Sequence, residues 1–198
     1  MWSEAIAFLS KDKYIAPLIK KWGKCTIKKS NKSKYFLDLL ESITNQQLSG
    51  KAASTIFGRI KILCKDNICP DAILSLSEVK LRSAGLSFAK IKYIKDLAGK
   101  VKNRELKIGS LDNLSDEEVK KELVSVKGIG PWTADMFLMF SLARPDIFPA
   151  GDLGIKNGFE KVTGKKFDEV KSVRFAEKHW KPYCTVASWY LWRSLENK

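Results

Sequence analysis

Asp152 is the acidic side chain whose setting in the sequence best suits catalysis. It lies in the run FPAGDLGIK, residues 148–156, directly before a stretch with helical periodicity. An Asp at that position is most often a helix N-cap that accepts hydrogen bonds from backbone N–H groups. It could equally be a carboxylate held near an apolar cleft at a helix N-terminus. The two roles are compatible, because capping would orient the group.

A second feature is the run KGIGP, residues 127–131, where two glycines and a proline interrupt a helical pattern. Two glycines allow a tight hairpin whose backbone N–H groups point outward near a helix N-terminus. Such an arrangement binds phosphate without needing a side chain. The alternative is an ordinary turn between antiparallel helices, and the glycine spacing alone favours that alternative.

Aromatic residues are concentrated near the C-terminus. They are Trp180, Tyr183, Trp189, Tyr190 and Trp192. On a helix that begins at residue 182, these side chains form two stripes, which implies that the helix is buried on two sides. Most of them therefore belong to the core, and one aromatic side chain is left to line a pocket.

Metal chemistry is not expected from this sequence. The four cysteines, Cys25, Cys64, Cys69 and Cys184, contain no CxxC pair, and the chain has a single His. Zinc sites need closely spaced ligands, and iron–sulfur clusters need grouped thiolates. We expect thiols that are free or buried in a reducing cytosol, with no catalytic metal and no cofactor.

The elements that must position these residues are helices, because patterns with a period of 3.6 recur along the chain. The expected helices span residues 35–48, 50–64, 71–82, 88–102, 131–143, 152–161, 167–179 and 182–196, with another from about 115 to 126. Ser115 with Glu118, and Ser75 with Glu78, have the spacing of capping boxes. Pro131 suits the first position of its helix, which is apolar around nearly its whole circumference and so should be buried. The fold class is all-α, an orthogonal helical bundle.

Length and charge narrow the classes of protein further. The chain has 198 residues, with 36 Lys and Arg against 22 Asp and Glu, a net charge of +14. This length favours one domain or two small lobes. The positive charge suits nucleic acid, an anionic membrane surface or acidic proteins as partners. No apolar run reaches transmembrane length and the first residues do not form a secretory signal, so a soluble intracellular protein is expected.

Five motifs taken together resemble one known family. They are KGIGPWTAD (127–135), DLGI (152–155), ITNQQLSGKAA (43–53), GLSFAK (85–90) and WKPY (180–183). In their order and spacing along the chain they are similar to the helix-hairpin-helix DNA glycosylases, in the alkylpurine (3-methyladenine) branch and in a compact form without an N-terminal β-domain. The resemblance implies that residues 1–198 form one glycosylase domain of two helical lobes. The hairpin motif, at about 115–143, would lie between the lobes.

The resemblance also implies roles for particular residues. Asp152 matches the catalytic carboxylate, and Gln47 matches the side chain that wedges into the duplex where the damaged nucleotide leaves. The base pocket would contain Trp132, Met136 and Trp192, although some relatives carry an aromatic residue in place of Met136. The phosphate-binding hairpin would comprise Val126, Lys127, Gly128, Ile129, Gly130 and Thr133, and its carbonyls could hold a monovalent cation.

The implied activity is monofunctional repair: alkylated purines are flipped out of double-stranded DNA, and the N-glycosidic bond is hydrolysed to leave an abasic site. Such a protein would act as a monomer, in the nucleoid of a bacterial cytoplasm or in a nucleus, without a membrane partner. Two alternatives stay open. One is a glycosylase for oxidised or mismatched bases, many of which carry a nucleophilic lysine where this chain has Trp132. The other is a non-catalytic DNA-binding module built on the same hairpin.

Overall fold

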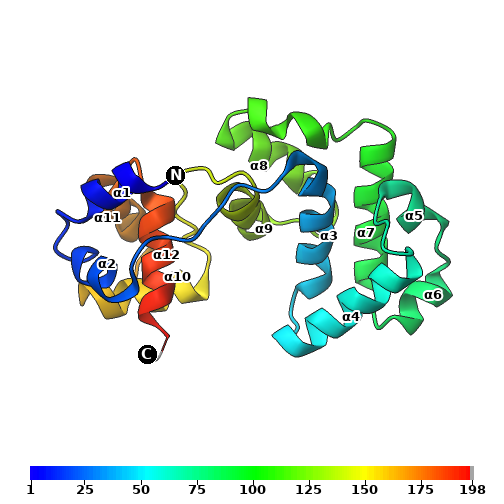
Figure 1. Cartoon of the computed structure of the whole chain (residues 1–198), viewed down its shortest axis with the longest axis horizontal. Helices are drawn as coiled ribbons and strands as arrows, with labels where there is room; N and C mark the ends of the chain where they lie inside the picture. The colour runs from blue at the N-terminus through cyan, green and yellow to red at the C-terminus, as the bar shows by residue number, and fades with distance from the viewer. Residues whose placement is uncertain (197–198) are drawn as a thin grey trace. The chain divides into compact units, whose positions relative to one another are not determined.

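The computed structural model describes residues 1–196, and within that range the chain is helical with no strand (Figure 1). The chain divides into two compact units. Unit 1 contains residues 1–29 and the chain from Leu138 onward, and unit 2 contains Ser30–Phe137. The all-α class and the two lobes are confirmed, while the assignment of both units to a single domain stays a prediction.

Unit 1 is built around its last helix. Its helices are α1 (Ser3–Leu9), α2 (Ala16–Trp22), α10 (Leu153–Thr163), α11 (Glu169–Trp180) and α12 (Cys184–Ser194). The other four pack against α12 (Figure 1), in which nine of eleven residues are buried. The approach of α10 is so close that a Cβ on Gly158 would lie 2.5 Å from the Leu191 carbonyl oxygen. Helix α12 is therefore buried on both of the sides that carry the expected stripes of apolar side chains.

The three C-terminal helices confirm their predicted ranges to within about two residues at most ends. The two N-terminal helices were not predicted. One side-chain hydrogen bond lies within their segment, residues 1–29, and another joins that segment to α12. The Trp2 indole donates to the Ile27 carbonyl at 2.8 Å, and the Tyr190 hydroxyl donates to the Gly23 carbonyl at 2.7 Å. Burial raises the pKa of the Tyr190 hydroxyl to about 12. The hydroxyl therefore stays protonated and able to donate this bond near neutral pH.

Unit 2 is built around α7. Its elements are η1 (Lys32–Lys34), α3 (Tyr35–Asn45), α4 (Gly50–Leu63), α5 (Pro70–Ser75), α6 (Glu78–Ser83), α7 (Phe88–Lys102), η2 (Ile108–Asn113), α8 (Asp116–Val124) and α9 (Pro131–Met136). Helix α7 packs against α3, α5 and α6 (Figure 1). It contributes Ile91, Ile94 and Leu97 to the core, each at most 1% exposed. The ranges predicted for α4 and α7 are confirmed.

The single helix predicted over 71–82 is wrong. The structure has α5 and α6 instead, because Leu76 is extended and turns its own side chain into the core. Ser75 forms no capping box, since its hydroxyl donates to the Ala72 carbonyl at 2.8 Å. Ser77 is the N-cap of α6 and accepts from the Lys80 N–H at 3.3 Å.

The capping box predicted before α8 is confirmed. The Ser115 hydroxyl oxygen accepts from the Glu118 N–H, and the Glu118 carboxylate accepts from the Ser115 N–H at 2.8 Å. These hydrogen bonds lower the pKa of the Glu118 carboxyl. The acidic residues of the first turn also suit the positive end of the helix dipole.

The helix predicted over 131–143 begins at Pro131 as expected but is not α-helical throughout. Helix α9 ends at Met136 and continues as a π-helical segment, η3 (Phe137–Ser141). A π turn holds an extra residue, so the side chains after it point in directions that an α-helix would not give them. The prediction that this helix is buried all round is wrong for Trp132 and Phe140, which are 43% and 41% exposed.

Candidate functional site

Asp152 lies at the N-terminus of α10 and caps that helix, as predicted. Its Oδ1 atom accepts a hydrogen bond from the Ile155 N–H at 2.8 Å. The residue is half-buried, so the carboxylate is not simply part of the solvated surface. Capping supplies one fixed point for the orientation of the group.

Trp192 provides a second hydrogen bond that orients the Asp152 carboxylate. The indole Nε1–H donates to the same Oδ1 atom of Asp152 at 2.8 Å, from α12. Trp192 was predicted to line the base pocket, and the structure brings it into direct contact with the predicted catalytic carboxylate. Two donors on one oxygen, one from each of two packed helices, define the direction of the carboxylate closely.

Gly154 makes room for this contact. A Cβ at Gly154 would lie 2.7 Å from Cδ1 and 2.9 Å from Nε1 of Trp192. Real Cβ contacts are not so short, so only glycine allows the indole to reach Asp152 in this way. Gly154 belongs to the DLGI motif, but no role for it was predicted from the sequence. Its position two residues after a candidate catalytic Asp was the available signal.

Phe140 is the other residue of unit 1 that the sequence reasoning missed. Its ring centroid lies 5.8 Å from that of Trp192 with an interplanar angle of 31°. Rings at this distance and tilt contact each other favourably. Phe140 was assigned to a buried core face, whereas the structure exposes it beside Trp192. Asp152, Trp192 and Phe140 therefore form one cluster within unit 1.

In unit 2, the hairpin between α8 and α9 is anchored by its apolar residues. Val126 and Ile129 are 1% and 3% exposed. Gly128 has φ +82°, a left-handed conformation that glycine adopts without strain. A Cβ at Gly128 would also lie 2.2 Å from the Tyr93 ring. The first glycine of the motif is thus required both by its backbone conformation and by its packing on α7.

Not every N–H group of the hairpin points outward as predicted. The Lys127 N–H donates to the Asp96 carboxylate at 2.9 Å, and the Ile129 N–H donates to the Val126 carbonyl at 3.1 Å. Within residues 1–196 the N–H groups of Gly128 and Gly130 have no such acceptor. Both of these N–H groups are therefore available to an anion.

A monovalent cation at the hairpin stays a prediction. The Gly128 carbonyl already accepts from the Gln46 amide at 2.8 Å, and the Val126 carbonyl accepts from Ile129. Each carbonyl oxygen has two lone pairs, so one bond does not exhaust it. Carbonyl oxygens are also the ligands that hard cations prefer. The donor set is therefore compatible with such an ion.

Helix α9 carries three of the predicted residues. Thr133 is buried, and its hydroxyl lies 3.5 Å from the Gln46 amide, so its side chain does not face solvent as a phosphate ligand would. Trp132 is half-exposed and lines a hollow of about 590 Å³ together with Gln47 and Leu48. Met136, one turn later and half-buried, is not among the residues that line this hollow.

Gln47 is exposed at the turn that joins α3 to α4. The predicted helix over 35–48 is wrong beyond Asn45, because Gln46 has a non-helical ψ of 132° and Gln47 has φ +57°. Gln47 is therefore not an ordinary residue on the surface of a helix, which was the alternative to its role as a wedge. The structure places Gln47 and Trp132 on one hollow of unit 2.

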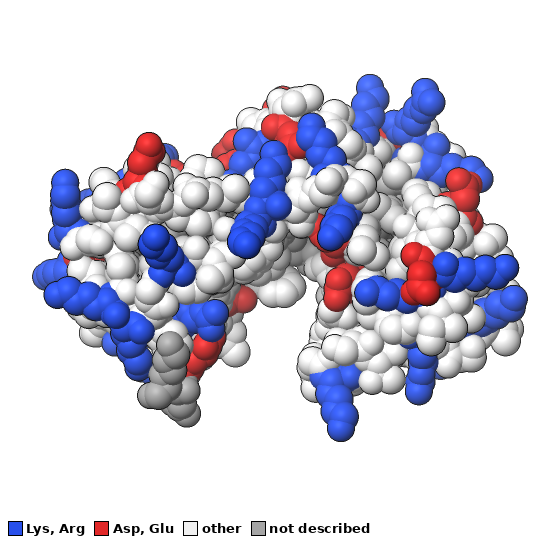
Figure 2. All heavy atoms as spheres, in the orientation of Figure 1, with Lys and Arg blue, Asp and Glu red and all other residues white. Residues whose placement is uncertain are grey.

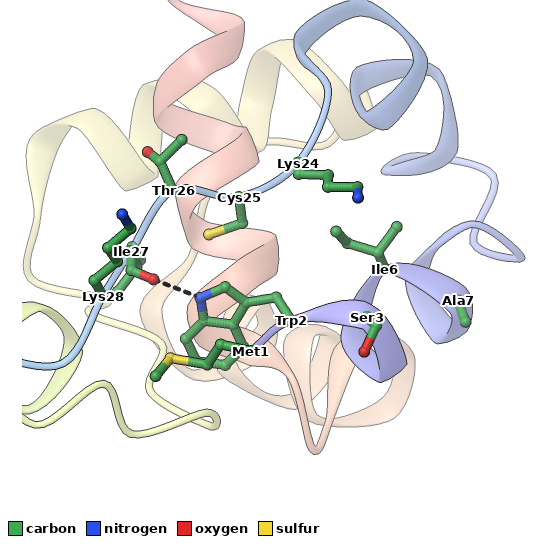
Figure 3. A pocket seen from close by; sticks show the side chains of 10 residues that line it. All are labelled: Met1, Trp2, Ser3, Ile6, Ala7, Lys24, Cys25, Thr26, Ile27 and Lys28. Atoms are coloured by element: carbon green, nitrogen blue, oxygen red, sulfur yellow. Dashed lines mark hydrogen bonds between the residues drawn. The ribbon is translucent and has the colours of Figure 1, made fainter.

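A second hollow, in unit 1, contains none of the predicted site residues. It has a volume of about 460 Å³ and is lined by Met1, Trp2, Ser3, Ile6, Ala7, Lys24, Cys25, Thr26, Ile27 and Lys28 (Figure 3).

The four cysteines are free thiols, and burial raises the pKa of Cys25 to about 11. Within residues 1–196 no three His, Cys, Asp or Glu side chains are grouped so that they could hold a metal ion.

The surface in Figure 2 shows Lys and Arg side chains projecting from both units, with fewer acidic side chains among them. This distribution agrees with the excess of 36 basic over 22 acidic residues. No helix within residues 1–196 has the length and apolar character needed to span a membrane.

Comparison with known proteins agrees with these features. The family model of the HhH-GPD superfamily of base excision DNA repair proteins matches residues 40–182. The DNA-3-methyladenine glycosylase 1 of Schizosaccharomyces pombe is 33% identical over 173 residues, which cover 82% of this chain and 73% of that protein. The chain spans only 58% of the length of a Bacillus subtilis relative that is 34% identical over 168 residues.

Two solved structures are similar over nearly the whole chain. A DNA-3-methyladenine glycosidase from Bacillus halodurans has a TM-score of 0.86 and 35% identity, covering 97% of this chain and 88% of that one. A 3-methyladenine DNA glycosylase from S. pombe, in complex with abasic DNA, has a TM-score of 0.82 and 31% identity, covering 97% and 96%. The chain belongs to the HhH-GPD superfamily of base excision DNA repair proteins.

Proposed function

We propose that this protein is a monofunctional DNA glycosylase that removes alkylated purines from double-stranded DNA. The observation that carries the proposal is the Asp152 carboxylate, whose Oδ1 accepts hydrogen bonds from both Ile155 and Trp192. A carboxylate oriented by two donors beside aromatic rings suits a reaction in which positive charge develops on the substrate. Membership in a base excision repair family makes DNA the substrate.

The target base cannot react inside the duplex and must first be flipped out, at a cost of a few kcal/mol that is lowest for damaged pairs. Gln47 is the proposed wedge, since it is exposed on a turn and can fill the space that the nucleotide leaves. The N–H groups of Gly128 and Gly130 would hold a backbone phosphate. The protein would act as a monomer, in the nucleoid or the nucleus.

Recognition would use the charge of the lesion. Purines alkylated at N3 or N7 are cationic, and aromatic faces attract cations. Trp192, with Phe140 beside it, offers such a face in unit 1. Trp132 and Met136 on α9 are the proposed pocket residues of unit 2. A flexible Met in place of an aromatic residue changes the shape of the pocket and therefore the range of lesions accepted.

The chemistry needs no strong general acid, because a cationic purine leaves with the bonding electron pair and becomes neutral. The sugar is left positively charged at C1′, where the Asp152 carboxylate would stabilise it electrostatically. The same carboxylate would accept a proton from the water that attacks C1′. The products are a free purine and an abasic site, and the strand is not cut.

Asp152→Asn tests this proposal. Asn still caps a helix, so the fold should be kept while the negative charge is lost. We expect excision of alkylated purines to fall by at least about a hundredfold, the scale of a lost transition-state contact. Affinity for abasic-site DNA should change little, because the charge acts on the transition state.

Asp168→Asn is a matched control, since Asp168 caps α11 by accepting from the Lys171 N–H at 2.9 Å. It should leave excision unchanged. Substantial turnover by Asp152→Asn would overturn the role of Asp152. Binding of alkylated DNA by the wild-type protein without release of free base would favour the non-catalytic module instead.

A further inference from the structure

The turn that carries Gln47 is unusual in its backbone. Helix α3 ends at Asn45, and Gln47 then adopts φ +57°. A side chain with a Cβ adopts this left-handed conformation at a cost of about 1–2 kcal/mol, so surrounding contacts must hold it. None of the last-turn residues of α3 is basic, although a cation there would suit the negative end of the helix dipole.

Lys90 of α7 supplies that cation from another helix. Its ammonium donates to the Thr44 carbonyl at 2.7 Å and to the Gln46 carbonyl at 2.5 Å. The carbonyl between them, on Asn45, accepts from the Leu48 N–H at 3.2 Å. Three successive carbonyls at the end of α3 are therefore satisfied. The Lys90 ammonium is partly buried, and this loss of hydration lowers its pKa. The two carbonyl acceptors replace part of the hydration that the ammonium has lost.

Gln46 connects the same turn to the hairpin. Its amide donates to the Gly128 carbonyl at 2.8 Å and lies 3.5 Å from the Thr133 hydroxyl. Gly128 is one of the two glycines of the hairpin whose N–H is available to an anion. The side chain before the proposed wedge thus touches the backbone of the proposed phosphate site, 82 residues later in the chain.

One side of α7 supports both segments. Lys90 holds the turn, Tyr93 packs against Gly128, and Asp96 accepts from the Lys127 N–H at 2.9 Å. These residues follow one another at intervals of three, so they are neighbours along the helix surface. A rigid helix thereby fixes the distance between the Gln47 turn and the hairpin.

We propose that Lys90 and Gln46 are positioning residues for base flipping, which hold the Gln47 turn in its wedge conformation and in register with the phosphate-binding hairpin. The inference rests on the proposed function, since it takes Gln47 to enter the duplex. Neither residue needs to contact DNA for this role. When the hairpin holds a phosphate, the Gln47 turn then enters the base stack at a fixed distance from that phosphate.

The test is the ratio of two dissociation constants, one for a duplex with a tetrahydrofuran abasic analogue and one for the same duplex without it. Lys90→Met removes the donors, and Gln46→Met removes the amide at nearly constant length. We expect each to lower the preference for the lesion duplex by about tenfold, the scale of a lost hydrogen bond in a partly buried site. The fluorescence of 2-aminopurine beside the lesion should report less flipping.

Lys92→Met is the matched control, because Lys92 is exposed on the same helix and loses the same charge. It should weaken binding to both duplexes equally and leave the ratio unchanged. Lys90→Arg keeps the charge and should retain most of the preference. If Lys90→Met does not fold, Gln46→Met and Lys90→Arg carry the test.

A ratio for Lys90→Met equal to that for Lys92→Met, or for Gln46→Met equal to that of the wild type, would overturn the inference. These outcomes are distinct from failure of the proposed function. That failure would be a wild-type protein that releases no base from alkylated DNA, whatever its preference for the abasic duplex.

Discussion

At the scale of single residues, the Asp152 carboxylate depends on a residue that has no functional group. Trp192 reaches Oδ1 at 2.8 Å only because the side chain of Gly154 is absent. The catalytic geometry that we propose is therefore a matter of packing as well as of chemistry. Sequence reasoning found Asp152 and Trp192 but could not show that they touch, because they lie 40 residues apart.

Gly154→Ala should separate packing from stability. Ala favours a helix by about 1 kcal/mol over Gly, so α10 itself should gain. The new Cβ would displace the Trp192 ring and break its hydrogen bond to Asp152. We expect single-turnover excision to fall by about tenfold or more, the scale of one lost hydrogen bond to a charged group, while the melting temperature changes little.

Gly99→Ala in α7 is the control, since a Cβ at Gly99 meets no atom within 4 Å. It should raise stability slightly and leave excision unchanged. An excision rate for Gly154→Ala equal to that of the wild type would mean that the Trp192 contact does not orient the carboxylate.

A second prediction at this scale concerns strand cleavage. A lyase needs an amine that attacks the sugar carbon. The resemblance to the glycosylase family implies that Trp132 takes the position of that lysine in this chain. Lys127 is 73% exposed and Lys156 is exposed, so neither amine is desolvated in the way that a nucleophile requires. Lys90 is partly buried, but its amine is bound to two carbonyls.

Borohydride added during turnover on alkylated DNA should therefore trap no covalent protein–DNA adduct. A known bifunctional glycosylase assayed in parallel would verify the trapping reaction. An efficient trap that disappears when one of these lysines is replaced would contradict both the monofunctional activity and the pocket role of Trp132.

At the scale of elements, the hairpin depends on its contact with α7. Gly128→Ala should impose two penalties, one from φ +82° and one from a Cβ placed 2.2 Å from the Tyr93 ring. We expect the free energy of unfolding to fall by about 2–4 kcal/mol, combining backbone strain and overpacking. Urea denaturation followed by circular dichroism measures this change.

Gly164→Ala separates the two penalties, because Gly164 has φ +69° and a Cβ there meets no atom within 4 Å. It should cost only about 1–2 kcal/mol, the strain alone. Equal losses from the two variants would show that Tyr93 gives way and that α7 does not fix the hairpin.

The elements also show what the sequence could predict. Long periodic helices such as α4 and α7 were found because their apolar side chains repeat along one face. The break between α5 and α6, the end of α3 at Asn45 and the π segment after Met136 were missed. The end of α3 involves contacts with a residue far along the chain, Lys90, and the Leu76 side chain between α5 and α6 is buried in the core. Local periodicity records neither of these.

At the scale of the whole molecule, the chain has more basic side chains than its own acidic side chains could neutralise in ion pairs. Local ion pairs exist, such as Lys120 with Asp135 at 2.7 Å and Lys102 with Asp71 at 2.6 Å. Even if each of the 22 carboxylates paired with one of the 36 cations, fourteen cations would remain, which is the net charge of +14. Positive charge on both units suits a long polyanion.

Binding to undamaged duplex should therefore depend steeply on salt. The logarithm of the association constant should fall by about 0.9 for each neutralised phosphate against the logarithm of the salt concentration. Fluorescence anisotropy across a salt series measures the slope. Lys127→Met should lower the slope by about one if this hairpin lysine, whose ammonium lies 3.9 Å from Asp96, contacts phosphate. Lys102→Met, which removes a cation held more closely by Asp71 at 2.6 Å, should not. A flat salt response in the wild type would mean that the basic excess is solvated and that phosphate contacts do not drive binding.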